Sequence, residues 1–131
     1  AVVGLIGTLG AGKTHLVGAV AQACGIAPQD TGSPTFVLIR EYHGSRVIYH
    51  FDTYRLHDED EFIELGPEEY FYGDGLSFVE WSERVESVLP PDRLDIEIEI
   101  TGNDSRLFRL VGHGDEFSRL ACEIVASPAL T

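Results

Sequence analysis

The sequence contains little positive charge. Nine lysine and arginine residues stand against 22 aspartate and glutamate residues, so the formal net charge is −13. A protein of this charge is repelled by phosphate backbones and anionic membrane surfaces, so we expect no direct DNA binding and no membrane association. An anionic ligand would have to be held locally, by backbone N–H groups, one or two cations and a metal ion.

Other features are also scarce. Methionine is absent, so we expect that residue 1 is not a translational start and that a short N-terminal segment is missing. No signal peptide and no apolar run of membrane-spanning length occur, and we expect a cytoplasmic protein. The two cysteines, Cys24 and Cys122, lack metal-ligand spacing and fall in apolar helical patterns, so we expect buried, inert thiols. A length of 131 residues, 44% of them hydrophobic, fits a single domain over residues 1–131.

The spacing of apolar residues predicts strands interleaved with helices. Strands are expected over residues 1–6, 35–42, 46–51, 76–79, 93–101 and 106–111, and helices over residues 13–24, 58–65, 82–89 and 115–125. The second and third strands form a predicted β-hairpin, and residues 66–75 a predicted loop. In the fifth strand Leu94 and three isoleucines alternate with Asp95, Glu97 and Glu99, and we expect this acidic face to be solvated.

Residues 7–14, Gly-Thr-Leu-Gly-Ala-Gly-Lys-Thr, match the P-loop pattern GxxxxGK(S/T) between a predicted strand and a predicted helix. Glycines let backbone N–H groups approach phosphates, and the helix N-terminus adds positive partial charge. Lys13 is the only lysine in the chain, which favours a lysine placed for phosphate over a solvated one. The residues expected to bind the nucleotide are Leu9, Gly10, Ala11, Gly12, Lys13, Thr14, His15 and Trp81.

The single lysine also bears on the choice of base. GTPases recognise guanine with an Asn-Lys-x-Asp element, which needs a second lysine that this chain lacks. ATP is therefore the expected nucleotide. For Trp81, base contact and a core or lid role both remain open.

Two predicted strands end in an acidic residue, Asp52 and Glu80. P-loop NTPases need a carboxylate beyond the magnesium ion. One of the two would hold magnesium water while the other positions or deprotonates the attacking water, and the sequence does not decide which. Taken singly, each could equally be a strand-end cap or a surface acid.

Four further residues have two interpretations each. Thr35 follows the first helix, where a hydroxyl completes the magnesium shell in such folds, but the same pattern fits a turn entering a strand. Arg55 would neutralise charge on a transferred phosphoryl group, although most strand-end arginines form surface ion pairs. His50 and His57 flank Asp52, but they lack tight ligand spacing, so we interpret them as core and loop histidines and not as a metal triad.

Four segments together resemble the TsaE family of small bacterial ATPases: residues 10–14 (Gly-Ala-Gly-Lys-Thr), 33–36 (Ser-Pro-Thr-Phe), 50–56 (His-Phe-Asp-Thr-Tyr-Arg-Leu) and 79–81 (Val-Glu-Trp). The resemblance implies an α/β fold, a P-loop NTPase with a mixed, partly antiparallel sheet and flanking helices. It also implies binding and slow hydrolysis of ATP with Mg2+, in a complex with the TsaB and TsaD proteins that makes the threonylcarbamoyladenosine modification of tRNA. Contact with tRNA would then be indirect, through these partners.

Carried over by position, the resemblance implies a role for each matching residue. Thr35, Asp52 and Glu80 would be catalytic, Thr14, Asp52 and Glu80 would form the metal site, and Trp81 would lie beside them. The chain departs from the family at Thr8, where an acidic residue is usual. Two other functions stay open: a small-molecule kinase, although the arginines are scattered and not clustered in a lid, and a nucleotide-dependent binding module without turnover.

Overall fold

A computed structural model describes residues 1–8, 10–27, 39–54, 56 and 58–126. Its strands are β1 (Val2–Gly7), β2 (Ile39–His43), β3 (Val47–Asp52), β4 (Leu76–Glu80), β5 (Arg93–Ile100) and β6 (Arg106–His113). Its helices are α1 (Lys13–Ala23), α2 (Glu59–Glu64), α3 (Pro67–Phe71), the 3-10 helix η2 (Ser82–Val88) and α4 (Asp115–Ala126).

All six strands form one sheet in the order β2-β3-β4-β1-β5-β6. The four central strands are parallel, and β2 and β6 pair antiparallel at the two edges. The predicted mixed, partly antiparallel sheet is therefore confirmed, and so is the predicted hairpin over its described part, β2 and β3. The remainder of the predicted second strand, residues 35–38, lies outside the described residues.

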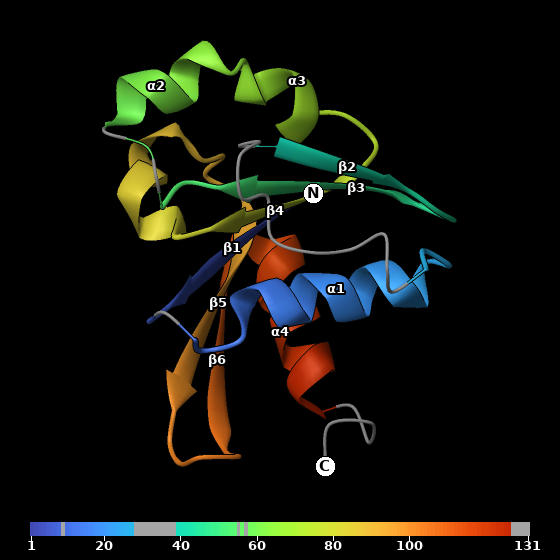
Figure 1. Ribbon diagram of the computed structural model, residues 1–131, viewed down its shortest axis with the longest axis vertical. Helices are drawn as coiled ribbons and strands as arrows, with labels where there is room; N and C mark the ends of the chain where they lie inside the picture. The colour runs from blue at the N-terminus through green and yellow to red at the C-terminus, as the bar shows by residue number, and fades with distance from the viewer. Residues whose placement is uncertain (9, 28–38, 55, 57, 127–131) are drawn as a thin grey trace.

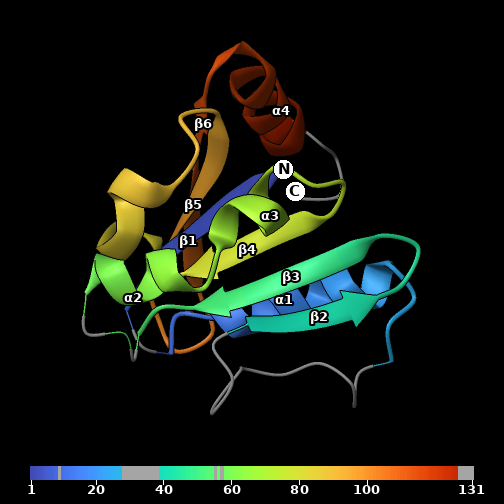
Figure 2. The same ribbon diagram turned by 90° about the horizontal axis from the view of Figure 1, so that it is seen from above.

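Helices cover both faces of this sheet (Figure 1). One core lies beneath α1 and α4, where Leu5, Val17 and Ile48 are fully buried. The second core lies on the opposite face, where the ring of Phe62 from α2 packs against the ring of Phe51 from β3. Figure 2 shows β2 and β3 running above α1, with α4 beside β6. The parallel strands thus end together at one edge of a sheet that is packed on both faces.

The predicted loop over residues 66–75 is wrong, because it contains α3. Gly66 adopts the left-handed conformation, with φ 67°, and Pro67 occupies the start of the helix. Glu68 and Glu69 follow in the first turn. Proline at the first position and acids in the first turn are ordinary helix start signals, so the signals for this helix were in the sequence.

Two burial predictions also need correction. Cys122 is exposed and Cys24 is only partly buried, because α4 packs through one face and Cys122 lies outside it. The acidic face of β5 is not uniformly solvated, since Asp95 is buried while Glu99 is exposed. Among the described residues, no helix combines the length and the apolar composition needed to cross a bilayer.

Candidate nucleotide site

The P-loop connects β1 to α1, as the sequence predicts. Gly10 and Gly12 have φ values of 82° and 113°, in the left-handed region that glycine adopts without steric cost. A Cβ atom at either glycine would meet nothing within 4 Å, so the space beside this backbone is open. Ala11 closes the turn by donating its N–H to the carbonyl of Thr8 at 3.0 Å. The loop therefore presents backbone to an open space at the N-terminus of α1.

Lys13 folds back over the P-loop. Its Nζ donates to the carbonyl oxygens of Gly7 at 2.6 Å and Thr8 at 3.0 Å. The same Nζ lies 4.0 Å from the centroid of the Trp81 ring, a cation–π distance. Burial lowers the pKa of Lys13, and the nearby carboxylates, Glu80 foremost, oppose part of this effect. The ammonium group is thus held by partners that an anionic ligand would outcompete.

The carboxylates of the candidate site lie on neighbouring strands. β3 and β4 run parallel with Asp52 directly opposite Glu80 in the register, at the edge of an α/β sheet where ligands bind. Asp52 Oδ1 accepts a hydrogen bond from the backbone N–H of Tyr54 at 3.0 Å. Glu80 is buried. The sequence expectation that two strand-end acids meet beside the P-loop is consistent with this register.

Glu80 is in direct contact with the P-loop helix. The Thr14 hydroxyl donates to the Glu80 carboxylate, at 2.8 Å from Oε2 and 3.0 Å from Oε1. His50 reaches the same carboxylate from the neighbouring strand through its Nε2. The histidine is therefore a buried core residue, as predicted, but its contact with Glu80 was not foreseen.

Trp81 follows Glu80 in a left-handed backbone conformation, with φ 59°, the only non-glycine residue with positive φ among those described. Such a backbone costs about 1–3 kcal/mol and persists where surrounding contacts fix it. Thr53 supplies one such contact, because its hydroxyl donates to the carbonyls of Glu80 at 3.0 Å and Trp81 at 2.9 Å. The Trp81 ring packs against the Tyr54 ring at 5.0 Å between centroids.

Arg84 fixes the segment after β3. Its guanidinium donates to the carbonyls of Thr53 at 2.9 Å, of Leu56 at 2.5 Å and of Tyr54. Sequence reasoning missed Arg84, since nothing in a lone arginine four residues after Glu80 signals this role. The effect is to brace the segment that carries Tyr54 against η2.

These groups surround one cavity of about 240 Å3. It is lined by Gly10, Gly12, Lys13, Thr14, His15, Asp52, Tyr54, Glu80 and Trp81. Every one of these except Tyr54 was predicted as a site residue. The predicted residues Leu9 and Thr35, and the alternatives Arg55 and His57, lie outside the described residues.

The donor set suits a magnesium nucleotide better than a metal held by protein alone. The described residues contain no group of three or more His, Cys, Asp or Glu side chains arranged to hold a metal ion. A hydroxyl and carboxylates are nevertheless the oxygen ligands that Mg2+ prefers, and Mg2+ usually completes its shell with water and substrate phosphates. Thr14, Glu80 and Asp52 fit that mode.

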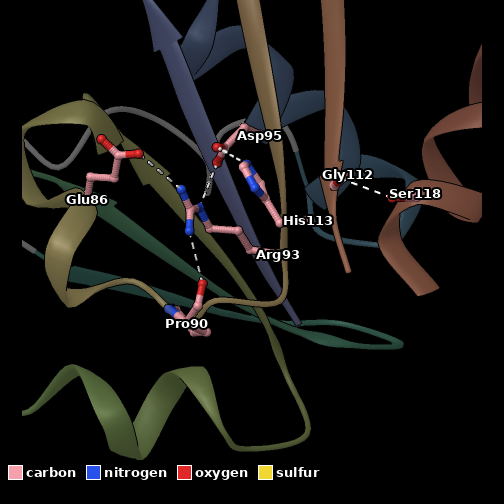
Figure 3. Close-up of polar contacts among 7 residues, drawn as sticks. All are labelled: Glu86, Pro90, Arg93, Asp95, Gly112, His113 and Ser118. Carbon is pink, nitrogen blue, oxygen red and sulfur yellow. Dashed lines mark hydrogen bonds and ion pairs between the residues drawn. The ribbon is translucent and has the colours of Figure 1, made fainter. Parts of the chain in front are cut away.

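A second polar cluster lies on the face of the sheet that points away from α1 (Figure 3). Arg93 Nε donates to Asp95 Oδ1 at 3.1 Å, and His113 Nε2 lies 2.8 Å from Asp95 Oδ2. We call Arg93, Asp95 and His113 the Asp95 cluster. Arg93 also donates to the carbonyl of Pro90 at 3.1 Å, and it lies 3.6 Å from Glu86. Here every charged group has a partner of opposite charge or a hydrogen bond.

Comparison with known proteins gives consistent matches. The family model for threonylcarbamoyl adenosine biosynthesis protein TsaE matches residues 1–108. The tRNA threonylcarbamoyladenosine biosynthesis protein TsaE of Bacillus subtilis is 41% identical over 121 residues, which cover 92% of this chain and 75% of that protein. The protein of the same name from Treponema pallidum is 42% identical over 105 residues, covering 80% and 77%.

A solved structure agrees with this result. The crystal structure of Bacillus subtilis YdiB superposes with a TM-score of 0.75 at 35% identity, covering 95% of this chain and 76% of that one. The fold is therefore that of a P-loop protein with a mixed sheet, as the sequence predicts.

Proposed function

The chain belongs to the TsaE family of threonylcarbamoyl adenosine biosynthesis proteins, and we propose that it binds ATP with Mg2+ and hydrolyses ATP slowly in support of the threonylcarbamoyladenosine modification of tRNA. We propose further that it works in a complex with TsaB and TsaD, through which it meets tRNA indirectly. Such a role is consistent with a cytoplasmic protein that forms a single domain over residues 1–131.

One observation carries the nucleotide part of this proposal. Lys13, Thr14 and Glu80 line one cavity beside open P-loop glycines, with Thr14 donating to Glu80 at 2.8 Å. An ammonium, a hydroxyl and a carboxylate are the groups that a P-loop protein uses for the terminal phosphates, the metal and the water shell of the metal. Their meeting in one place supports a magnesium nucleotide as the ligand.

The contacts support different roles for the two acids, Glu80 and Asp52. Glu80 touches Thr14, the residue whose hydroxyl binds Mg2+ in P-loop proteins, so we assign Glu80 to the metal side. Asp52 lines the same cavity one strand away, and we assign it to the water that attacks the γ-phosphate. Thr35 stays a proposed contributor to the magnesium shell, and Leu9, Gly10, Ala11, Gly12 and His15 to phosphate binding.

Thr14 and Glu80 would hold the magnesium ion, which when bound would supply positive charge to neutralise the phosphates. Lys13 would leave the carbonyls of Gly7 and Thr8 and bind phosphate oxygens, because an ammonium group binds an anionic oxygen more strongly than a neutral carbonyl. Asp52 would orient the water and accept its proton as the bond to the γ-phosphorus forms and the bond to the leaving ADP oxygen breaks. Trp81, released from the ammonium group, would remain part of the cavity wall.

Calorimetric titration with magnesium-ATP and magnesium-GTP, beside a Lys13→Ala variant, tests the binding step. We expect saturable binding of ATP that the variant loses and weaker binding of GTP. No binding of either nucleotide by the unaltered protein would contradict the proposal.

Turnover is tested separately, because a site completed by a partner loses positioning and charge stabilisation without it. Asp52→Ala and Glu80→Ala should each lower ATP hydrolysis measured with TsaB and TsaD present. Unchanged turnover in both variants would leave a nucleotide-dependent binding module as the better description.

A further inference from the structure

His50 lies in the middle of β3, directly opposite Phe78 of β4. Its side chain is 1% exposed, between the fully buried Ile48 and Phe51 of the same strand. Burying an imidazole costs free energy unless it is hydrogen-bonded, and an apolar residue would fill a core position at no such cost. The ring therefore needs an explanation, and its single hydrogen-bonding contact among the described residues is Glu80.

The two ring nitrogens have different surroundings. Nε2 contacts Glu80 Oε2, whereas Nδ1 is buried and has no partner among the described residues. A neutral imidazole carries one N–H and one lone pair. A lone pair on Nε2 would face the carboxylate oxygen and be repelled, and an N–H on Nδ1 would be buried without an acceptor. The proton therefore belongs on Nε2, which donates it to Glu80.

This hydrogen bond fixes the direction of the Glu80 side chain. Oε2 accepts from His50, and both carboxylate oxygens lie within 3.0 Å of the Thr14 hydroxyl. Residues i and i+2 of a strand share a face, so His50 and Asp52 lie on one face of β3, beside the face of β4 that carries Glu80. Without His50, the carboxylate at the end of β4 would keep, in the part of the chain that the structure describes, only the Thr14 hydroxyl to orient it.

We propose that His50 is a positioning residue for magnesium: its Nε2–H holds Glu80 toward Thr14, so that the oxygen ligands are in place before the magnesium nucleotide arrives. The proposal rests on the proposed function, because it assigns Glu80 to the metal side of the site. Groups that orient metal-binding carboxylates typically change metal affinity about 10- to 100-fold when they are removed.

Two substitutions separate this role from simple packing. The side-chain amide nitrogen of glutamine can occupy the position of Nε2, whereas that of asparagine occupies the position of Nδ1 and falls short of Glu80. The measurement is calorimetric ATP binding at a series of Mg2+ concentrations and in EDTA, with denaturant unfolding of each variant. We expect His50→Asn to raise the Mg2+ concentration for half-maximal binding about 10- to 100-fold, and His50→Gln to restore it to near the unaltered value. ATP binding in EDTA should be the same in all three proteins.

The outcomes distinguish the two proposals. An unaltered protein that binds no ATP overturns the proposed function and this inference with it. If the unaltered protein binds ATP, an unchanged Mg2+ requirement in His50→Asn, or the same shift in both variants, overturns the positioning role alone.

A measurement on the unaltered protein covers the case in which His50→Asn fails to fold. The 15N chemical shifts of the His50 ring report its tautomer, with His50→Gln used to assign the signal. A proton on Nε2 supports the proposal, and a neutral ring with its proton on Nδ1 overturns it.

Discussion

Two buried carboxylates, Glu80 and Asp95, each contact a histidine, but their other partners differ. Asp95 accepts from the guanidinium of Arg93 as well as from His113. Glu80 accepts from two groups that carry no fixed charge, the hydroxyl of Thr14 and the ring of His50. A buried charge is costly unless it is paired. Within the described part of the chain, Asp95 is thus paired with a cation in direct contact and Glu80 is not.

Glu80 and Asp95 also lie at different places in the sheet. Glu80 is the last residue of β4, beside the P-loop helix, whereas Asp95 is the third residue of β5 and its side chain lies on the opposite face. Ligands of open α/β sheets bind beyond the carboxyl ends of the strands. A buried acid with its own arginine, away from that edge, already has its charge compensated within the fold. A buried acid at that edge, held among the described residues by a hydroxyl and an imidazole, is suited to meet a cation that arrives with a ligand.

The largest expected effect comes from removing the charge of Glu80. Glu80→Gln should lower ATP turnover, measured with TsaB and TsaD present, by about 100-fold or more, because the positioning of the metal ion depends on this carboxylate. The free energy of unfolding should stay the same or rise, since an acid without a contacting cation is replaced by a neutral amide. Denaturant unfolding checks the second part, and a large loss of stability would show that Glu80 is mainly structural.

Neutralising Asp95 should have the opposite pattern. Asp95→Asn should lower the free energy of unfolding by about 3 kcal/mol, because buried Arg93 loses its buried counter-charge and keeps, among the described residues, only the exposed Glu86, 3.6 Å away. ATP affinity of the folded variant should change less than about twofold, because additivity holds for sites without shared partners. The matched control is Glu99→Gln on the same face of β5, whose exposed pair with Arg109 at 2.9 Å contributes no more than about 1 kcal/mol. Equal unfolding free energies in the two variants would contradict the difference drawn between the clusters.

The comparison also shows how far the sequence could lead. The P-loop and the strand-end positions of Asp52 and Glu80 follow from local pattern, so the main groups of the candidate site were predictable. The pairing of Asp95 was not predictable. Period-two alternation cannot distinguish a solvated acid from one that contacts Arg93 and also His113, 18 residues later in the chain. Contacts between strands decide whether such an acid is solvated or paired.

The residues that orient the site could not be predicted from local sequence either. His50 stands two residues before Asp52, yet only the register of β3 against β4 brings it to Glu80. The contacts of Arg84 with the carbonyls after β3 span up to 31 positions. The sequence identifies groups able to meet a ligand, whereas the groups that orient them depend on tertiary packing.

Magnesium-ATP should stabilise the protein through the Glu80 site and leave the Asp95 cluster unaffected. At a concentration 100 times the dissociation constant, a ligand that binds only the folded state adds about 2.7 kcal/mol to the free energy of unfolding. We expect this gain in the unaltered protein and in Asp95→Asn, but not in Lys13→Met. Thermal unfolding with ATP, with and without EDTA, measures it, and a gain that persists fully in Lys13→Met would place the ligand elsewhere.

The smallest effect concerns Lys13, a cation that interacts with Glu80. Burial lowers the pKa of Lys13 in the folded protein. Between this pKa and that of the unfolded chain, the folded protein binds fewer protons than the unfolded chain. This lysine therefore makes the free energy of unfolding rise with pH across that window. Phosphate binding requires the ammonium form. ATP affinity should therefore fall by up to about tenfold per pH unit once the pH exceeds the pKa of Lys13 in the free protein, and the fall should begin below the ordinary pKa of a lysine.

Because the chain contains a single lysine, lysine-labelled NMR gives the pKa of Lys13 from one signal. Lys13→Arg is the control, since arginine keeps its proton and should remove the pH dependence. A titration at or above the ordinary lysine value would mean that Glu80 and its neighbours outweigh burial, and that the Glu80 site, like the Asp95 cluster, already contains the cation it needs.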